Sequence, residues 1–275
     1  MLDQTIKYIF VVEFKRSMYI MNIDNGNKLN QLLQYWQPGG LLFSAWLNKN
    51  GYSAQLIQQY RRSGWFSMLT RGVMYRTGDK LSSYAAISSY NTQLNNRFYV
   101  GAHSALELSG FNHYVPMGKP VLMIGYPIQE NIPKWLINTE FENELKFFST
   151  KTFQNTQLTT FNKRNCEVLT SVPEQAFLEC LMLAPSQYAY IDLFYIMEQL
   201  TTLRAEVVQQ LLENTDNIKI KRLFLYMAEK AGHDWYSRLD KAKIELGTGK
   251  YKLADNGIYL PEYMITIPRE LYEYE

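Results

Sequence analysis

The chain has 275 residues, of which 47% are hydrophobic and 20% are charged, and its formal net charge is +2 at pH 7. This length suffices for two domains with a sizeable buried core. The two cysteines, Cys166 and Cys180, exclude a disulfide framework and indicate a reducing compartment. We find no signal peptide, transmembrane helix, repeat or low-complexity segment, so we expect a cytoplasmic protein with no membrane partner.

Charge is distributed unevenly along the chain. Residues 1–76 contain 9 Lys and Arg against 3 Asp and Glu, whereas residues 77–275 contain 19 against 23. A basic N-terminal part on an acidic remainder fits a DNA-binding domain joined to a second domain. Charge also drifts along chains that bind no nucleic acid, so this asymmetry carries modest weight.

Residues 1–26 form an N-terminal extension with two possible origins. Residues 6–23 are rich in β-branched and aromatic side chains. Either Met18 or Met21 is the true start of the protein, or residues 8–14 are an added strand or helix that packs on the body. The sequence does not separate these two interpretations.

Residues 27–78 have the element order of a winged helix-turn-helix domain, which is three helices followed by a β-hairpin. Capping residues and helical spacing predict a second helix that Ser44 opens and that ends at Asn50 and Gly51. They predict a third helix over residues 53–63, with Gly64 as its C′ residue. A short turn containing Gly between two helices is typical of the helix-turn-helix motif.

The predicted hairpin has strands at residues 65–69 and 73–76, joined by a turn at residues 70–72. In a winged helix-turn-helix domain this hairpin is the wing. Arg71 lies at its tip, where a cation can reach the DNA backbone or the minor groove.

The third helix is the predicted recognition helix. Leu56, Ile57 and Tyr60 recur on one side at helical spacing, and the other side carries amides and guanidinium groups but no carboxylate. Gln and Arg pair bidentately with adenine and guanine edges, and Arg also binds phosphate. The same residues would also serve solubility or protein contact. The candidate DNA-binding residues are Ser53, Gln55, Gln58, Gln59, Arg61, Arg62, Arg71 and Arg76.

Residues 79–275 predict a larger C-terminal domain of mixed α/β structure, so the expected fold class is α+β. Its mixed α/β part spans residues 79–162 and its mainly helical part residues 163–275. The expected helices lie at residues 81–94, 102–109, 133–138, 173–184, 203–212 and 218–231. Residues 188–200 are very apolar, and we expect them to be buried. The expected strands lie at residues 98–100, 121–125, 144–153, 250–253 and 263–267.

The histidines and cysteines suggest no metal site. His103, His113 and His233 lie outside any HExxH motif, and neither cysteine lies in a CxxC motif. We expect His103 to cap or pack at a helix start and His233 to belong to a structural turn. Both cysteines fit core positions better than catalytic ones.

Two further patterns have structural interpretations. Residues 247–250 resemble the end of a phosphate-binding loop, but Tyr251 replaces the Ser or Thr that binds magnesium. We therefore reject a phosphate-binding loop there. The alternating acids Glu140, Glu142 and Glu144 are typical of a solvated face. We expect no enzyme activity, no catalytic residue and no cofactor.

Several segments together resemble the AbiEi family. They are LNQLLQYW, FSAWLNKNGYSAQLIQQYRRSGW and RGVMYR near the N-terminus, GAHSALELSGFNHYVPMG at residues 101–118, and residues 200–213, 221–235 and 238–250. The resemblance covers nearly the whole chain after about Asn27, and it is specific in combination. Members of this family are the antitoxins and autorepressors of type IV toxin–antitoxin systems, found also in phage-defence (abortive infection) loci.

The resemblance implies a DNA-binding antitoxin that represses its own operon through inverted repeats in the double-stranded DNA of its promoter. It implies that residues 79–275 counter a cognate nucleotidyltransferase toxin of the AbiEii type without a stable complex. It does not say which side chain contacts which base.

Two other classes stay open. One is a winged-helix transcription regulator whose C-terminal domain senses a ligand or dimerises and which has no toxin partner. A neighbouring nucleotidyltransferase gene would favour the antitoxin over this regulator. The other is an enzyme, such as a nuclease, within residues 82–162, which a cleavage assay with magnesium would test.

Overall fold

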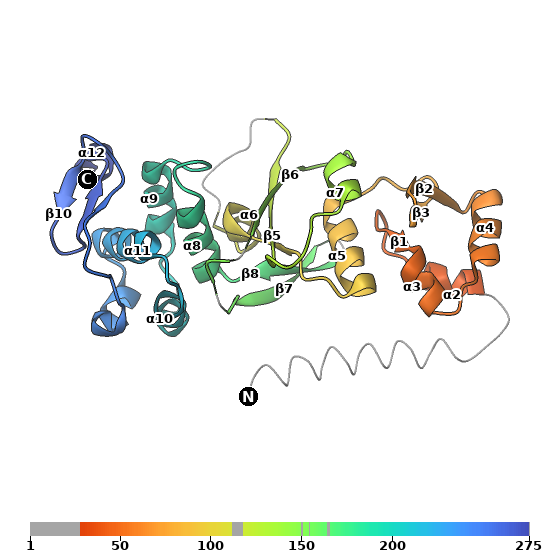
Figure 1. Ribbon diagram of the computed structural model, residues 1–275, viewed down its shortest axis with the longest axis horizontal. Coiled ribbons are helices and arrows are strands. Elements are labelled where there is room, and N and C mark those ends of the chain that lie inside the picture. The colour runs from red at the N-terminus through yellow and green to blue at the C-terminus, as the bar shows by residue number, and fades with distance from the viewer. Residues whose placement is uncertain (1–27, 112–117, 150, 154, 164–165, 275) are drawn as a thin grey trace. The chain divides into compact units, whose positions relative to one another are not determined.

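The structure is a computed structural model that describes residues 28–111, 118–149, 151–153, 155–163 and 166–274 (Figure 1). The N-terminal extension and His113 lie outside these residues. The chain divides into two units, residues 1–38 and residues 39–275. The described part of the first unit holds one helix, α2 (Lys28–Gln34), in which Leu32 is buried. This helix confirms the first of the three helices expected before the hairpin.

The second unit begins with a three-stranded sheet and two helices. Their order is β1 (Leu42–Phe43), α3 (Ser44–Lys49), α4 (Ala54–Arg62), β2 (Phe66–Thr70) and β3 (Val73–Arg76). The second and third expected helices and both expected hairpin strands are confirmed. Strand β1 was not expected, because its two residues become a strand only by pairing with β3.

One expected helix cap is wrong by a residue. Ser44 is the first helical residue of α3, and Phe43 occupies the N-cap position without a side-chain hydrogen bond. The reason is that β1 runs directly into α3, so Phe43 ends the strand and starts the helix at once. The expected end of α3 is confirmed, since Asn50 is its C-cap and Gly51 follows with φ +81°.

The sheet has the order β1-β3-β2 and both of its pairings are antiparallel. Arg71 and Gly72 form the hairpin turn between the paired residues Thr70 and Val73. Gly72 has φ +81°, a conformation that favours glycine. The turn therefore holds Arg71 at the end of the hairpin, as the sequence predicts.

A five-stranded sheet of order β6-β5-β4-β8-β7 forms the centre of the body (Figure 1). Its strands are β4 (Tyr99–Val100), β5 (Val121–Tyr126), β6 (Glu144–Ser149), β7 (Leu158–Lys163) and β8 (Cys166–Ser171). Strands β5 and β6 run parallel, as do β4 and β8, and the other neighbours are antiparallel. The hairpin of β7 and β8 was not expected, and β6 is shorter than expected.

The two faces of this sheet bury two separate hydrophobic cores. Tyr99, Met123 and Phe148 belong to one core, while Leu122 and Ile124 belong to the other. This alternation follows from the period of two along a strand. Helix α6 (Ala102–Leu108) joins the first core. Helices α5 (Ser83–Leu94) and α7 (Lys134–Asn138) join the second.

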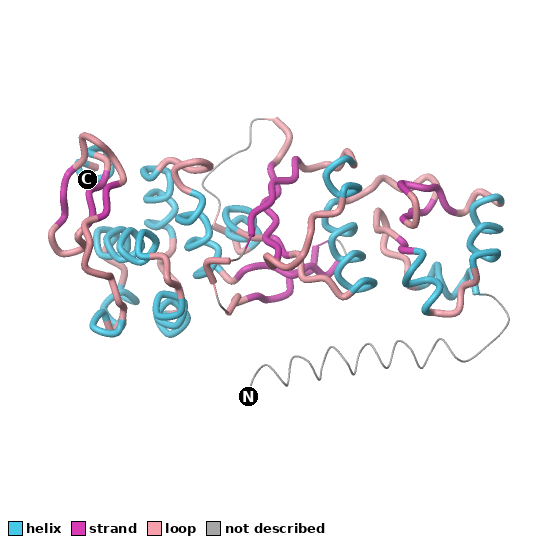
Figure 2. The backbone as a smooth tube through the Cα atoms, viewed as in Figure 1, coloured by secondary structure: helices cyan, strands magenta, loops and turns pink. Residues whose placement is uncertain are grey.

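The chain after β8 is mainly helical (Figure 2). Its helices are α8 (Pro173–Leu183), α9 (Tyr190–Gln199), α10 (Ala205–Asn214), α11 (Ile218–Ala231) and α12 (Arg269–Glu273), with short 3-10 helices η1 (Asp234–Arg238) and η2 (Lys241–Lys243). A small sheet of β9 (Tyr251–Lys252), β10 (Ile258–Leu260) and β11 (Ile265–Ile267) follows. Strand β10 and helix α12 were not expected.

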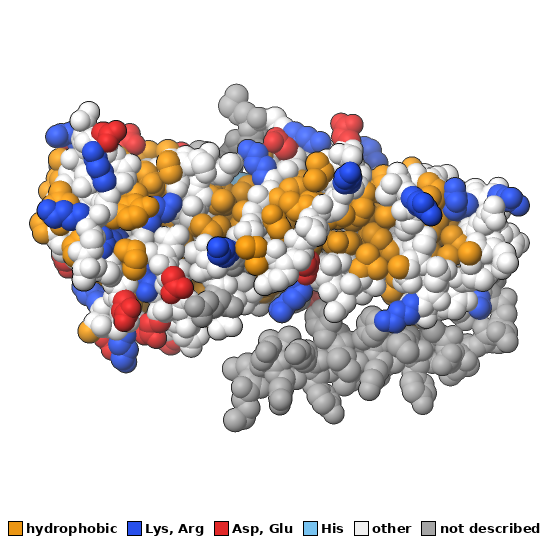
Figure 3. Space-filling view, in the orientation of Figure 1, with side chains coloured by type: hydrophobic (Ala, Val, Ile, Leu, Met, Phe, Trp, Pro, Cys, Tyr) orange, Lys and Arg blue, Asp and Glu red, His pale blue; other side chains and the backbone are white. Residues whose placement is uncertain are grey.

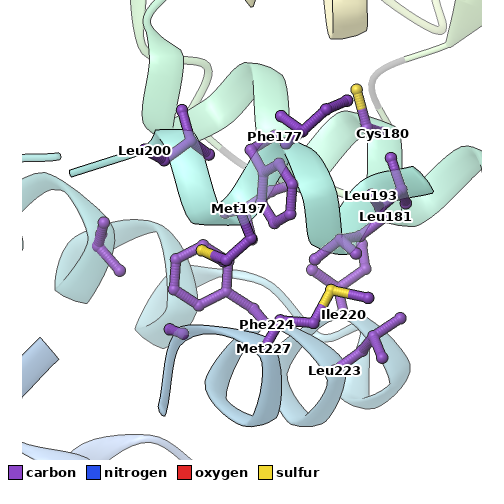
Figure 4. Packing of buried hydrophobic residues seen from close by; sticks show 14 of the residues in the cluster. Phe177, Cys180, Leu181, Leu193, Met197, Leu200, Ile220, Leu223, Phe224 and Met227 are labelled. Atoms are coloured by element: carbon purple, nitrogen blue, oxygen red, sulfur yellow. The ribbon is translucent and has the colours of Figure 1, made fainter. Parts of the chain in front are cut away.

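Large apolar side chains join α8, α9 and α11. Phe177, Met197 and Phe224 are fully buried and point toward one another (Figure 4). The rings of Phe177 and Phe224 lie 5.9 Å apart in an edge-to-face arrangement, which aromatic pairs favour. The apolar segment at residues 188–200 is buried in part. The buried residues are Tyr190, Leu193, Phe194, Ile196, Met197 and Leu200, whereas Ala189, Glu198 and Gln199 are exposed.

The loop at residues 247–250 is structural. Arg222 is only 1% exposed and donates hydrogen bonds to the carbonyl oxygens of Leu246, Gly249 and Met264. The guanidinium group thereby satisfies carbonyl groups of a loop that has little regular structure of its own. The buried cation thus serves the fold.

Glu142 has a role that its sequence pattern did not indicate. Glu140, Glu142 and Glu144 are all exposed, as expected for a solvated face. The Glu142 carboxylate also accepts hydrogen bonds from the Ser82 hydroxyl at 2.9 Å and the Ser83 N–H at 2.9 Å. It therefore caps the N-terminus of α5 from about 60 residues away, where a negative charge is stabilising.

The two described histidines and the two cysteines occupy structural positions. His233 Nε2 lies 2.6 Å from the carbonyl oxygen of Met197, and His103 Nδ1 lies 2.7 Å from the Tyr188 hydroxyl. Cys166 and Cys180 are buried and reduced. Within the described ranges, no group of three or more His, Cys, Asp and Glu could hold a metal ion. No helix in those ranges could span a membrane.

An ion pair between the buried Glu174 and the half-exposed Arg204 joins α8 to the start of α10. The Glu174 side chain is 2% exposed and accepts two 2.9 Å hydrogen bonds from the Arg204 guanidinium, whose side chain is 55% exposed. Burial raises the pKa of Glu174, but the hydrogen bonds from Arg204 outweigh burial and the pKa is lowered overall. The pair therefore stabilises the folded state above the usual carboxyl pKa.

We expect Arg204→Ala to lower the free energy of unfolding by roughly 1–2 kcal/mol at pH 7, because it leaves a buried carboxylate without its cation, while water already screens the half-exposed partner. The difference in unfolding free energy between the variant and the unsubstituted chain should be full above pH 4.5. It should shrink as the pH falls from there through the lowered pKa that Glu174 has in the folded state. Urea denaturation at several pH values measures this difference. An equal difference at pH 3 and pH 7 would contradict the assignment.

Candidate nucleic-acid interface

Helix α4 is built as the sequence predicts. The Ser53 hydroxyl oxygen accepts a hydrogen bond from the Leu56 N–H at 3.2 Å and so caps the helix. Ser63 is the C-cap, and Gly64 follows with φ +79°. These caps fix both ends of the nine-residue helix in space.

The inner side of α4 packs toward the hairpin. Ile57 is buried, and the ring of Tyr60 lies 6.0 Å from the ring of Phe66 at the start of β2. The Trp65 N–H also donates to the Tyr60 carbonyl oxygen at 3.0 Å. Burial raises the pKa of Tyr60. Because of these contacts, the helix and the hairpin lie side by side and present their outer surfaces together.

All eight residues predicted to contact DNA are exposed. Gln55, Gln58, Gln59 and Arg62 are spaced i, i+3, i+4 and i+7, so they share the outer face of α4. Arg61 lies beside this face. Ser53 lies at the N-terminal end of the helix, Arg71 in the hairpin turn and Arg76 at the end of β3.

The segment that contains α4 and the hairpin has an unusual charge pattern. Between residues 28 and 78 there is no Asp or Glu, and the six cations are Lys28, Lys49, Arg61, Arg62, Arg71 and Arg76. Over α4, β2 and β3, the visible surface carries Lys and Arg and no acidic side chains (Figure 3). An exposed surface of this kind attracts a polyanion.

Two apolar side chains of the hairpin were not among the predicted site residues. Trp65 is 41% exposed and Met68 is 38% exposed. Alternation along the strand places Met68 on the face of the buried Phe66, and both residues keep a regular register with β3. The register shifts only beyond Met68, between Met68 and Thr70.

An exposed helix and hairpin that carry Lys and Arg but no acidic residues precede an α+β domain in this chain. This arrangement is typical of one class of protein, the transcriptional regulators. Two family models match the chain and agree with this class. Residues 25–117 match the N-terminal domain of AbiEi antitoxin transcriptional regulators, and residues 119–268 match the AbiEi antitoxin transcriptional regulators of type IV toxin–antitoxin systems. The chain belongs to the AbiEi family.

A solved structure supports the fold alone. The crystal structure of the RV2827C protein from Mycobacterium tuberculosis is similar to this chain with a TM-score of 0.57 and 14% sequence identity. The similarity covers 82% of this chain and 85% of that chain. A comparison with curated proteins gave no match.

The N-terminal family model extends to residue 117, beyond the boundary that the sequence suggested at residue 78. Phe43 and Val73 of the three-stranded sheet, and Leu41 just before β1, belong to the same hydrophobic core as Ala85 and Ile87 of α5. The division of the chain at residue 78 stays a prediction.

Proposed function

We propose that this antitoxin-family regulator binds double-stranded DNA through the outer face of α4 and through the hairpin. The observation that carries the proposal is the exposed surface of residues 39–78, which has the five cations Lys49, Arg61, Arg62, Arg71 and Arg76 and no carboxylate. Duplex DNA is the polyanion whose major groove admits a helix, and Gln and Arg are the side chains that read its bases. The segment would then act as a winged helix-turn-helix domain.

The eight site residues divide into two roles under this proposal. Arg61, Arg62, Arg71 and Arg76 supply attraction to phosphate that does not depend on sequence, and this attraction weakens with salt. Base readout comes from Ser53, Gln55, Gln58 and Gln59, whose side chains present hydroxyl and amide groups.

Family membership supports the rest of the function. The protein would bind inverted repeats upstream of its own operon and repress it in the cytoplasm. Residues 79–275 would counter a cognate nucleotidyltransferase toxin of the AbiEii type without a stable complex. Co-expression of a DNA-binding-deficient variant with the neighbouring toxin candidate tests this division of labour. Rescue of growth would place the antitoxin activity in residues 79–275. Continued toxicity would show that antitoxin activity and DNA binding need the same surface.

Single substitutions distinguish the two roles of the site residues. Arg62→Ala should weaken binding to every duplex about fivefold at 0.15 M salt and reduce the slope of log K against log salt by about 0.9. Gln58→Ala should instead change the preference between operator and unrelated DNA, by about 1–3 kcal/mol for a bidentate contact. Gel-shift titrations at several salt concentrations measure both effects.

The matched control for the single substitutions is Arg269→Ala on α12, whose side chain is 61% exposed and pairs with Glu273. It removes one positive charge from the C-terminal part of the chain and should leave operator binding within twofold. If Arg62→Ala and Gln58→Ala also leave operator binding unchanged, the assignment of α4 as the recognition helix is wrong.

A further inference from the structure

The outer edge of β1 is completed by side chains of α5. The Gln93 amide accepts a hydrogen bond from the Phe43 N–H at 3.0 Å and donates one to the Leu41 carbonyl oxygen at 2.7 Å. The Ser89 hydroxyl accepts from the Leu41 N–H at 3.1 Å and donates to its own helix at Ala85. One amide and one hydroxyl thus make the contacts that a neighbouring strand would make.

The hydrogen bond from the Leu41 N–H to Ser89 is buried, and the two hydrogen bonds of Gln93 are partly buried. Leu41 is 1% exposed and Phe43 is 4% exposed. A buried backbone group that loses its only partner is costly, because water cannot replace that partner. Ser89 and Gln93 are spaced i and i+4, so both reach β1 from one face of α5.

In addition to these hydrogen bonds, aromatic rings pack β1 against helices α5 and α7. The ring of Phe43 lies 5.7 Å from the ring of Tyr90 on α5 and 5.7 Å from the ring of Trp135 on α7. Just before β1, Gly39 donates its N–H to the Asp79 carboxylate and accepts from the Ser82 N–H. A side chain at Gly39 would meet the Lys80 carbonyl oxygen at 2.7 Å, so the chain passes very close there.

Strand β1 is also connected directly to the candidate DNA-binding surface. Phe43 pairs with Val73 and is the N-cap residue of α3. The next residue, Ser44, donates its N–H to the carbonyl oxygen of Gly72, the residue after Arg71, at 2.9 Å. Helix α3 contacts α4. A displacement of β1 would therefore move both the hairpin turn and the recognition helix.

We propose that Gln93, assisted by Ser89, is a positioning residue for DNA binding: it holds β1 against α5 and so fixes Arg71 and α4 relative to the body. The proposal rests on the proposed function. Under this proposal, α5 sets the orientation in which the basic surface of α4 and the hairpin contacts the DNA duplex. Within the second unit, residues 39–78 and the chain that follows them then act as one rigid body rather than as two domains on a linker.

The test uses the full chain with Gln93→Met, which keeps the length of the side chain and removes both hydrogen bonds. We expect operator affinity to fall about tenfold, since two buried backbone groups lose their partners. The slope of log K against log salt should fall by about 0.9, because a misplaced Arg71 loses a phosphate contact. Amide hydrogen exchange at Phe43 should accelerate. Thr92→Ala is the matched control, since the Thr92 hydroxyl bonds only within α5 in the contacts described, and it should change none of these quantities.

A purely structural role gives a different result. If Gln93→Met only unfolds part of the sample, the active fraction falls while the affinity and the salt slope of the remainder stay unchanged, and the proposal is overturned. Should Gln93→Met not fold, Ser89→Ala removes one hydrogen bond to the Leu41 N–H, together with the Ser89 bond within α5. It should lower affinity about threefold and accelerate amide exchange at Leu41. Unchanged binding by both variants, while Arg62→Ala weakens it, would overturn the positioning role alone. No binding by the unsubstituted chain would instead overturn the proposed function.

Discussion

Replacing Arg61, Arg62 and Arg71 together with alanine should lower the affinity for duplex DNA roughly a hundredfold at 0.15 M salt, at about fivefold for each lost phosphate contact. The three side chains are exposed on α4 and in the hairpin turn, so their removal should not unfold the protein. The slope of log K against log salt should fall by about 2.7. Fluorescence anisotropy with a labelled duplex at four or five salt concentrations measures both quantities.

The matched control removes the same charge from another part of the chain. Lys243, Lys252 and Arg269 are exposed and form surface ion pairs in the C-terminal part. Their joint replacement with alanine should leave the salt slope unchanged and affect affinity only through the net charge of the whole protein. Equal losses in the two triple variants would mean that binding follows net charge and not the surface of α4 and the hairpin.

Glu179→Ala should lower the free energy of unfolding by about 3–4 kcal/mol, the largest stability effect we expect from one side chain. The Glu179 carboxylate is fully buried between α8 and the central sheet. Burial raises its pKa, and four hydrogen-bond donors partly offset this. The donors are the Tyr99 hydroxyl, the Ala102 N–H, the Ser171 hydroxyl and the Gln175 amide.

The alanine variant leaves these donors buried with no acceptor. The Ala102 N–H has a further constraint, because Ala102 has φ +48°, a strained conformation for a residue with a Cβ, and this hydrogen bond helps to hold it. Urea denaturation followed by circular dichroism measures the loss. Glu167→Ala on β8 is the control: Glu167 is exposed, and its loss should change stability by less than about 0.5 kcal/mol. Similar losses in both variants would contradict the role of Glu179.

The elements that local signals define could be predicted from the sequence. The Ser53 cap, the helical spacing of Ile57 and Tyr60 and the following Gly64 set the limits of α4, and the structure has it within one residue of the expected range. The range of α11 is as expected, because Asn217 caps it and Gly232 ends it. Capping and periodicity act over a few residues, so one sequence suffices to find them.

The elements that depend on distant partners could not be predicted. Strand β1 exists because it pairs with β3 and is completed by Gln93, whose partners lie 50 and 52 residues away. Strands β7 and β8 have many Thr, Asn and Glu positions and no strong alternation. The exposure of the site residues on α4 followed from helical spacing. The attachment of the hairpin sheet to α5 left no distinct signal, because Ser89 and Gln93 are two of several polar residues in that helix.

The most direct test of the DNA-binding surface is a nuclease footprint of the full chain on the DNA upstream of its own gene. We expect protection of inverted repeats at concentrations that leave unrelated DNA unprotected. We also expect this protection to disappear when Arg61, Arg62 and Arg71 are replaced. Equal protection of operator and unrelated DNA, or protection that survives the triple replacement, would contradict the proposed DNA-binding surface.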